Sequence, residues 1–233
     1  ISLLIFVVDI TNLKNIQDAL KIANNKLHLL SDITRHDILN QIQALLFYIE
    51  GLKSTTEDPQ AQTNISKILA SVENIERQIK FTRDYQDIGI REPMWQDIQM
   101  TIMKAVRPLK LDPITVIIEM SEMLVYADPL LEKVFYNLAE NARRYGEKIT
   151  KISFTDTFIN DSYVIVCEDD GVGIPTEYKK AIFKREYFRN TGFGLNLSQE
   201  ILGITELTIS ETGQPGLGAR FEILVPKGKL RKK

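Results

Sequence analysis

Three polar residues within a single helical turn, His36, Asp37 and Asn40, have types and spacing that could support nucleophilic chemistry. A neutral imidazole is abundant near neutral pH and can act as a nucleophile without prior activation. The Asp37 carboxylate could hold one ring nitrogen while the other attacks, and Asn40, one turn further on, could orient a water molecule. A solvated pair on a helix surface is the simpler alternative. His28 lacks such neighbours, and we interpret it as a surface histidine.

A downstream helical segment carries two amides and an arginine that could contact phosphate. Asn137 and Asn141 lie one turn apart, and amide oxygens can ligate a magnesium ion that already carries phosphates. Arg144 and Tyr145 follow on the next turn, where Arg144 could meet phosphate charge. Exposed amides on an amphipathic helix would give the same pattern, so this segment gains weight only together with the glycine clusters that follow it.

Two glycine clusters come after this helix. In the first, Asp169 directly follows a predicted strand and precedes Gly171 and Gly173. A carboxylate there could accept a hydrogen bond from the exocyclic amine of adenine, and the glycines would let the backbone approach the base. An ordinary turn is the alternative. The second cluster, residues 192–195, precedes a helix-like run whose free N–H groups could receive phosphates. Neither a P-loop nor a Rossmann fingerprint is present.

Aromatic and basic residues are interleaved between the two clusters, and they could close over a nucleotide as a lid. They are Phe183, Lys184, Arg185, Tyr187, Phe188 and Arg189. Packing of a small core would explain the aromatic residues equally well.

The elements that would carry His36 are two amphipathic helices. Apolar residues recur at alternating steps of three and four over residues 13–30 and again over 38–52, and the phase shifts close to His36. This shift predicts a solvent-facing ring. A polar turn at 51–59 leads to a second helix with the same spacing over 65–79. The two helices predict an antiparallel hairpin with too little core to stand alone, so two copies should pair into a four-helix bundle.

The pattern changes at residues 89–93, where we place a domain boundary, to mixed helices and strands. Helices are expected at 95–106 and over a segment that Asp128 and Pro129 begin and Gly146 ends. Strands are expected at 114–120, 151–157, 163–168, 206–210 and 219–225, and the basic residues 227–233 are expected to fray. Such an order favours an α+β domain, with a mixed sheet covered by helices on one face.

Composition indicates a soluble chain that is long enough for two domains, with 233 residues of which 44% are hydrophobic and 26% charged. A net charge of −2 argues against a nucleic-acid partner. The single cysteine, Cys167, fits a reducing, cytoplasmic compartment. The longest apolar run, residues 1–8, is too short to span a bilayer. Because the chain begins without methionine, we interpret it as a fragment, so any membrane attachment would lie in parts absent from it.

In this order, the motifs resemble those of sensor histidine kinases of two-component systems over nearly the whole chain. His36 with Asp37 and Asn40 is similar to the histidine box of that family, and residues 8–11 resemble the end of a PAS sensor domain. The downstream motifs are similar to the family's N box and glycine boxes. The residues that the resemblance assigns to nucleotide binding are Asn137, Asn141, Arg144, Tyr145, Asp169, Gly171, Gly173, Ile174, Lys184, Gly192, Phe193, Gly194 and Leu195.

The resemblance implies five segments. They are the end of a PAS-like sensor domain (1–11), a signalling coiled-coil helix (12–30), a dimerisation and histidine phosphotransfer domain (31–89), a catalytic ATP-binding domain (90–228) and a basic tail (229–233). The catalytic domain would have the Bergerat fold, an α/β sandwich with a mixed sheet and helices on one face.

The implied function is ATP-dependent autophosphorylation of His36, with Asn141 as the magnesium ligand, and transfer of the phosphoryl group to an aspartate of a response-regulator receiver domain. The partners would be a second copy of the hairpin and the receiver domain, with response-regulator phosphatase activity through Asn40. Gln41 and Asn190 stand where the family pattern has proline and glycine, and the loop at 175–191 is short for a lid. A degenerate ATP-binding scaffold and a clamp- or chaperone-like ATPase of the same fold are the alternatives.

Overall fold

The structure, a computed structural model, describes residues 11–159, 162–184 and 193–233. Contacts divide the chain into two compact units, residues 1–79 and 80–233, which we describe separately. The first is helical, and the second combines helices with β-sheets. The predicted fold class, helices followed by an α/β sheet domain with a mixed sheet, is confirmed. No helix in the described part of the chain has an apolar stretch long enough to cross a membrane.

The hairpin consists of α1 (Thr11–Thr55) and α2 (Pro59–Asp87). The prediction of a turn over 51–59 is wrong in its first half, because α1 continues to Thr55. The hydroxyl groups of Ser54 and Thr55 donate to the Gly51 carbonyl oxygen, at 2.8 and 3.2 Å, which satisfies a backbone acceptor of the last turn. The Asp58 carboxylate accepts from two backbone N–H groups at the start of α2, as an N-cap does.

The core of the hairpin is small. Its buried residues are Ile42 and Ile49 of α1 and Ile65 and Val72 of α2, each pair seven residues apart. The other members of the predicted apolar stripes include side chains that stay exposed within one chain. They are Leu45 (49% exposed), Leu52 (56%), Ile68 (50%) and Ile75 (46%). One chain therefore buries only part of the apolar stripe of each helix.

The second unit contains two sheets. Its strands are β1 (Met94–Asp97), β2 (Thr115–Glu119), β3 (Met123–Ala127), β4 (Lys151–Ile159), β5 (Ser162–Asp169), β6 (Thr208–Glu211), β7 (Arg220–Val225) and β8 (Leu230–Lys232). The larger sheet has the order β2-β4-β5-β7-β6, with β2 and β4 parallel and the other pairs antiparallel. The smaller sheet has the order β1-β3-β8 and is antiparallel throughout.

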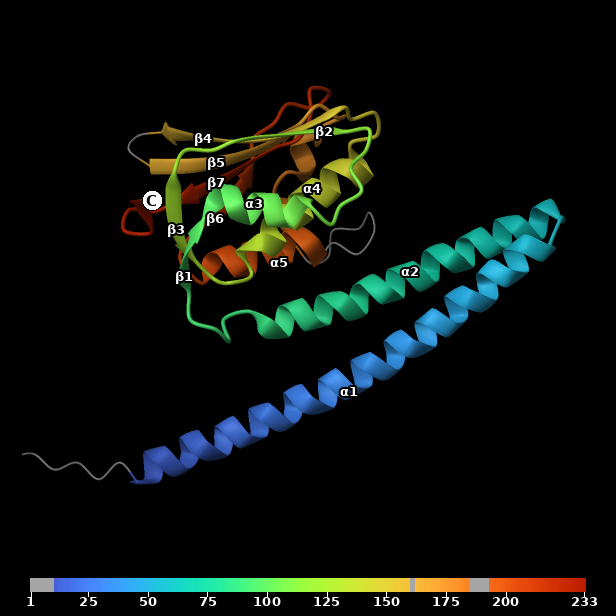
Figure 1. The fold of residues 1–233 in the computed structure, drawn as a ribbon, viewed down its shortest axis with the longest axis horizontal. Coiled ribbons are helices and arrows are strands. Elements are labelled where there is room, and N and C mark those ends of the chain that lie inside the picture. Colours follow the sequence, from blue (N-terminus) through green and yellow to red (C-terminus); the bar gives the residue numbers. More distant parts are fainter. Residues whose placement is uncertain (1–10, 160–161, 185–192) are drawn as a thin grey trace, which may run out of the picture. The chain divides into compact units, whose positions relative to one another are not determined.

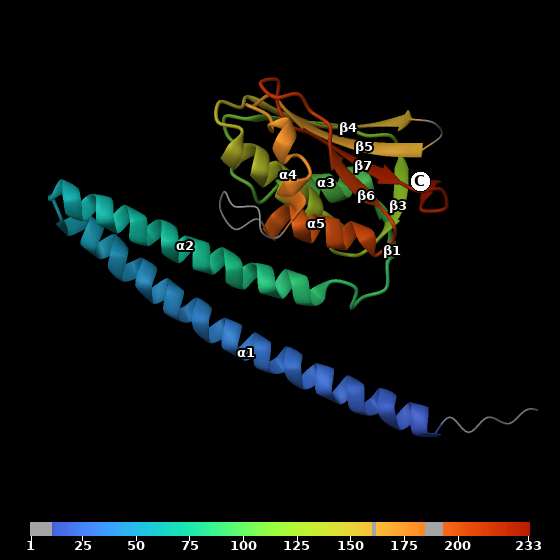
Figure 2. The same ribbon diagram turned by 180° about the vertical axis from the view of Figure 1, so that it is seen from behind.

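Three helices, α3 (Ile98–Val106), α4 (Leu131–Tyr145) and α5 (Phe193–Gly203), cover one face of the larger sheet (Figures 1 and 2). One stripe of α4 is buried, and the Phe135 ring packs edge-on against Phe154 of β4, with the ring centroids 6.1 Å apart. Two short 3-10 helices, η1 (Thr176–Tyr178) and η2 (Ala181–Phe183), follow β5. The core thus lies between the sheet and its helical layer, as predicted.

The smaller sheet corrects two predictions. Residues 95–97 form strand β1 rather than the start of a helix, because the Asp97 side chain accepts from the Met100 N–H at 3.0 Å and so begins α3 one turn later. The end of the chain does not fray, since Leu230–Lys232 pairs with β3 as strand β8. A cation–π contact holds it there, with the Arg231 guanidinium 4.2 Å from the Trp95 ring centroid. Strand β3 was not predicted.

The end of α2, from residue 80 on, is part of the second unit. Phe81 and Ile88 contact the core of this unit, and the Asp84 carboxylate lies 3.3 Å from the Lys133 ammonium group on α4. The Gly89 N–H donates to the carboxylate of Asp128 at 3.1 Å. The division by contacts therefore falls at 79/80, about ten residues before the predicted change at 89–93.

Candidate functional site

The His36 side chain is exposed on α1, with 74% of its surface accessible. Its Nδ1 atom lies 3.3 Å from an Asp37 carboxylate oxygen and 3.3 Å from the Asn40 amide nitrogen. These two contacts require different tautomers, because a carboxylate accepts only from protonated Nδ1, whereas the amide N–H donates only to unprotonated Nδ1. The expectation of a solvent-facing ring is met within one chain, and the three residues predicted to act together do meet at one nitrogen atom.

Asp169 lies at the end of β5, where the residue is 7% exposed. Its Oδ1 atom accepts from the Gly171 N–H at 2.9 Å and the Ala219 N–H at 3.2 Å. Burial raises the pKa of this carboxyl above its usual range, against the effect of the two donors. Oδ2 accepts no hydrogen bond from another described residue, so the fold engages only one of the two carboxylate oxygens.

The glycines after Asp169 permit close packing of the protein against itself. A Cβ atom on Gly171 would lie 2.7 Å from the backbone of Gly146, at the end of α4. Gly173 has a φ angle of +69°, and a Cβ atom there would lie 2.8 Å from the Gly218 carbonyl oxygen. We expected these glycines to admit a ligand's base. In the structure, the absence of side chains at these glycines lets the turn after β5 pack closely against the end of α4 and the β6–β7 connection.

The two amides of α4 differ in their surroundings. The Asn137 side chain donates to the Gly194 carbonyl oxygen at 3.1 Å and to the Ser198 hydroxyl at 3.3 Å, so it links α4 to α5. Asn141 is half-buried and makes no side-chain hydrogen bond with the described residues. The Arg144 guanidinium lies 3.9 Å from the Glu140 carboxylate, a partner that the sequence did not suggest. Of the two amides, Asn137 is therefore the one that the fold engages, and no described residue engages the Asn141 side chain.

The remaining predicted residues are dispersed around these groups. Tyr145 is exposed beside Arg144, whose guanidinium lies 5.6 Å from its ring centroid, and Ile174 and Leu195 pack against the core. Lys184 is exposed. Gly192 lies outside the described residues, as do Arg185 and the rest of the predicted lid to Asn190, and Phe193 is described only as the start of α5.

Phe183, the first aromatic residue of that segment, is part of the core. It is buried and packs edge-on against Phe221 of β7, with the ring centroids 6.4 Å apart. The Asn196 amide of α5 donates to its carbonyl oxygen at 3.3 Å. At this residue the core-packing interpretation of the aromatic residues is therefore the correct one.

Asp170, which follows Asp169 in the chain, forms side-chain hydrogen bonds with the residues at the start of β4. Its carboxylate accepts from the Thr150 hydroxyl and from the N–H groups of Thr150 and Lys151, at 2.9 and 3.0 Å. The Thr150 hydroxyl is the largest cause that lowers the pKa of Asp170 to about 2. Sequence reasoning did not single out this residue, because its partners Thr150 and Lys151, at the start of β4, precede it by 20 and 19 positions.

We expect Asp170→Ala to lower the free energy of unfolding by about 1 kcal/mol at pH 7, a value discounted because the carboxyl is exposed. A lowered carboxyl pKa stabilises the fold above the unfolded pKa and loses that effect as the pH falls toward 2, so the difference from wild type should be about halved at pH 3. Urea titrations at both pH values measure this. Glu177→Ala, at an exposed carboxyl, is the control, and a pH-independent difference would contradict the assignment.

Comparisons with known proteins find relatives of one class. Residues 127–229 match the model of the histidine kinase-, DNA gyrase B- and HSP90-like ATPase family. The chain is 28% identical to the signal transduction histidine-protein kinase AtoS of Escherichia coli, over 82% of this chain and 33% of that protein. It is 26% identical to the phytochrome-like protein Cph1 of Synechocystis, over 88% of this chain and 30% of that protein. It thus spans about a third of the length of these relatives.

Solved structures share the fold. Full-length ShkA in complex with AMPPNP superposes with a TM-score of 0.59 at 17% identity, over 84% of this chain and 45% of that one. The catalytic domain of the histidine kinase ThkA gives a TM-score of 0.51 at 23% identity, over 59% of this chain and 97% of that one. The resemblance to sensor histidine kinases is confirmed: the chain is similar in sequence to these proteins, and its fold, a helical region followed by an α/β domain, is similar to theirs.

Proposed function

We propose that the protein is a histidine kinase in which ATP bound to the second unit phosphorylates His36 of the first. The phosphoryl group would then pass to an aspartate of a receiver domain, in the cytoplasm. The observation that carries this proposal is the exposed His36 ring with a carboxylate at Nδ1. It occurs in a chain whose second unit matches the family of ATPases that includes the histidine kinases.

The proposed nucleotide contacts follow from the described geometry. Asp169 Oδ2 would accept from the exocyclic amine of adenine, since Oδ1 is already engaged by two backbone donors. Asn141 and Arg144, one turn apart near the end of α4, would face the phosphates. The AMPPNP complex of ShkA, which shares the fold, supports an adenine nucleotide as the ligand.

A magnesium ion fits this site only when it is bound together with the nucleotide phosphates. Within the described residues no group of three or more histidine, cysteine or acidic side chains could hold a metal ion. The Asn141 amide oxygen is a neutral, hard donor of the kind that completes the coordination of a phosphate-bound magnesium ion. When bound, the ion would neutralise phosphate charge, and the protein's proposed share of its ligands is Asn141.

The tautomer of His36 sets its chemistry in the proposed reaction. When Asp37 accepts from Nδ1–H, the lone pair on Nε2 is free to form a bond to the γ-phosphorus, the bond from that phosphorus to the bridging oxygen breaks, and ADP leaves. The carboxylate stabilises the positive charge that develops on the ring. The Asn40 contact fits the other tautomer, in which Nε2 carries the proton and cannot attack. We infer that Asn40 turns away during phosphorylation and serves the reverse activity by orienting water.

A homodimer is the proposed assembly. Leu45, Leu52, Ile68 and Ile75 lie seven residues apart in pairs and are exposed in one chain, beside the buried residues of the hairpin. Exposed apolar stripes on two antiparallel helices are what a four-helix bundle covers. Sedimentation equilibrium should therefore give twice the chain mass of 26.7 kDa, and a monomer at micromolar concentration would contradict this assembly.

Incubation with radiolabelled ATP and magnesium tests the proposed reaction. Purified protein should acquire acid-labile, base-stable label, as a phosphohistidine does. ATP binding without labelling would instead favour a degenerate scaffold, and steady hydrolysis without labelling would favour a clamp-like ATPase. Addition of a phosphorylated receiver domain tests the reverse activity, which requires that the protein speed the loss of phosphate from that domain.

A further inference from the structure

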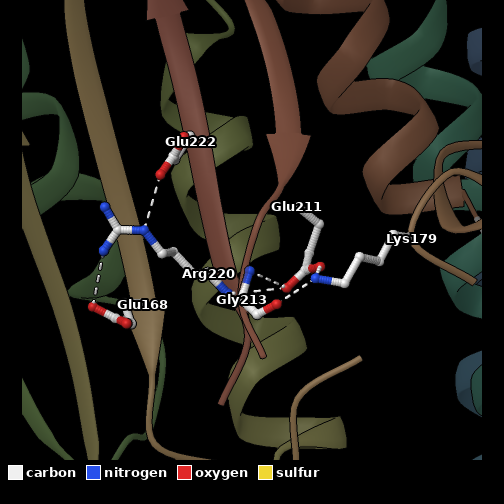
Figure 3. Close-up of polar contacts among 6 residues, drawn as sticks. All are labelled: Glu168, Lys179, Glu211, Gly213, Arg220 and Glu222. Carbon is white, nitrogen blue, oxygen red and sulfur yellow. Dashed lines mark hydrogen bonds and ion pairs between the residues drawn. The ribbon is translucent and has the colours of Figure 1, made fainter. Parts of the chain in front are cut away.

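Lys179 and Glu211 form a buried ion pair next to the turn after β5. Lys179 follows η1, and Glu211 is the last residue of β6. The Lys179 ammonium lies 2.8 Å from Glu211 Oε2, and the two side chains are 18% and 0% exposed. The same ammonium donates to the carbonyl oxygen of Gly213, so it contacts both the carboxylate and the backbone that follows it (Figure 3). An ion pair at this depth requires both partners, because either one alone would be a buried, uncompensated charge.

The Glu211 carboxylate organises the connection between β6 and β7, residues 212–219. Its Oε1 atom accepts from the Gly213 N–H at 3.0 Å and from the Arg220 N–H at 3.2 Å. These donors lie near the two ends of the connection, so one carboxylate oxygen draws both ends together while Oε2 faces Lys179 (Figure 3). Lys179 therefore ties the segment after Gly173 to this connection.

The same connection holds the proposed base-binding group. The Ala219 N–H donates to Asp169 Oδ1 at 3.2 Å, and the Asp169 N–H donates to the Ala219 carbonyl oxygen at 3.0 Å. The Gly216 N–H donates to the Val172 carbonyl oxygen at 2.8 Å. A shift of the connection would therefore displace two N–H donors together: that of Ala219, which bonds to Asp169, and that of Gly216, which bonds to the glycine turn at Val172.

We propose that Lys179 and Glu211 are positioning residues for nucleotide binding. They act through the β6–β7 connection, which places the Ala219 donor on Asp169, and neither side chain is assigned a contact with the nucleotide. The inference rests on the proposed role of Asp169 as the group that binds adenine. Substitution of a residue that positions a ligand-binding group can change the affinity for the ligand even when that residue does not contact the ligand.

Arg220 provides a matched contrast on the same connection. Its side chain extends away from Glu211 (Figure 3), with Nε 2.9 Å from Glu222 and a terminal nitrogen 3.4 Å from Glu168. Arg220→Met would therefore remove a cation and two ion pairs while it keeps the backbone N–H that donates to Glu211. Lys180, exposed and adjacent to Lys179, provides a second control.

The experiment measures ATP affinity by titration calorimetry, with magnesium, for wild type and Lys179→Met, Lys180→Met and Arg220→Met. We expect Lys179→Met to weaken ATP binding by about tenfold, and the two controls to stay within about twofold of wild type. If Lys179→Met fails to fold, the double variant Lys179→Met/Glu211→Gln removes the unpaired charge and keeps an acceptor for the two N–H groups. It should still bind ATP less tightly than wild type.

Hydrogen exchange of the Ala219 amide provides a readout that needs no nucleotide. We expect about tenfold faster exchange in Lys179→Met or in the double variant than in the controls. Unchanged exchange at Ala219, or wild-type ATP affinity in a folded variant that lacks Lys179, would overturn the inference. Failure of wild type to bind ATP would instead contradict the proposed function, and the exchange measurement would still decide whether the pair positions Ala219.

Discussion

His36→Gln should abolish incorporation of label from ATP, to below about one-thousandth of the wild-type rate, while ATP binding is unchanged. Glutamine has no ring nitrogen that can attack phosphorus. The side chain it replaces is 74% exposed, so the free energy of unfolding should change by no more than about 0.5 kcal/mol. Gel autoradiography measures the incorporation of label, and titration calorimetry measures ATP binding.

The chain has two histidines, which provides the control for this experiment. His28→Gln should retain full labelling, since we place no chemistry at that residue. Label that persists in His36→Gln would show that the acceptor lies elsewhere. Loss of ATP binding in His36→Gln would show that the substitution disturbs more than the acceptor, and the assignment would fail for that reason.

Asp169→Asn should weaken ATP binding by roughly 100-fold or more and leave the protein no less stable at pH 7. Asparagine keeps an oxygen for the Gly171 and Ala219 N–H groups, but its amide would present a donor to the adenine amine, which is also a donor. Affinity is measured by calorimetry with ATP and magnesium.

Stability should respond to Asp169→Asn in the opposite direction from affinity. Because burial raises the pKa of Asp169, the stability that this group contributes is present below the unfolded pKa and is lost as the pH rises through the folded value. At pH 7 the ionised carboxyl therefore carries a cost that asparagine lacks. Glu200→Gln, at an exposed carboxyl on α5, is the control for both measurements. A less stable variant with normal ATP affinity would contradict the proposed role.

Local sequence patterns predicted much of this fold. The phase shift of the apolar stripe near His36 correctly predicted an exposed ring, because helical periodicity determines which face a residue occupies. Asp169 was recognised because a strand and two glycines lie next to it in the chain. The strands at 151–157 and 163–168 were confirmed as parts of β4 and β5, since their apolar patterns are long enough to be distinctive.

The features that were missed depend on partners far away in the chain. Strand β8 is three residues long and pairs only with β3, which lies more than a hundred positions upstream. No local sequence pattern therefore predicts it. The Asn137 amide donates to Gly194 and Ser198, 57 and 61 positions away. Short edge strands and side chains that link separate helices therefore escape prediction from spacing alone.

The packing of the end of α2 has a practical consequence for dissecting the protein. Phe81 and Ile88 bury apolar surface against the core of the second unit, and Asp84 forms an ion pair with Lys133 of α4. A recombinant fragment cut at residue 90 would uncover that surface and leave a lysine without its counterion. A fragment that starts just before residue 80 would retain these contacts, and it is the natural choice for isolating the second unit.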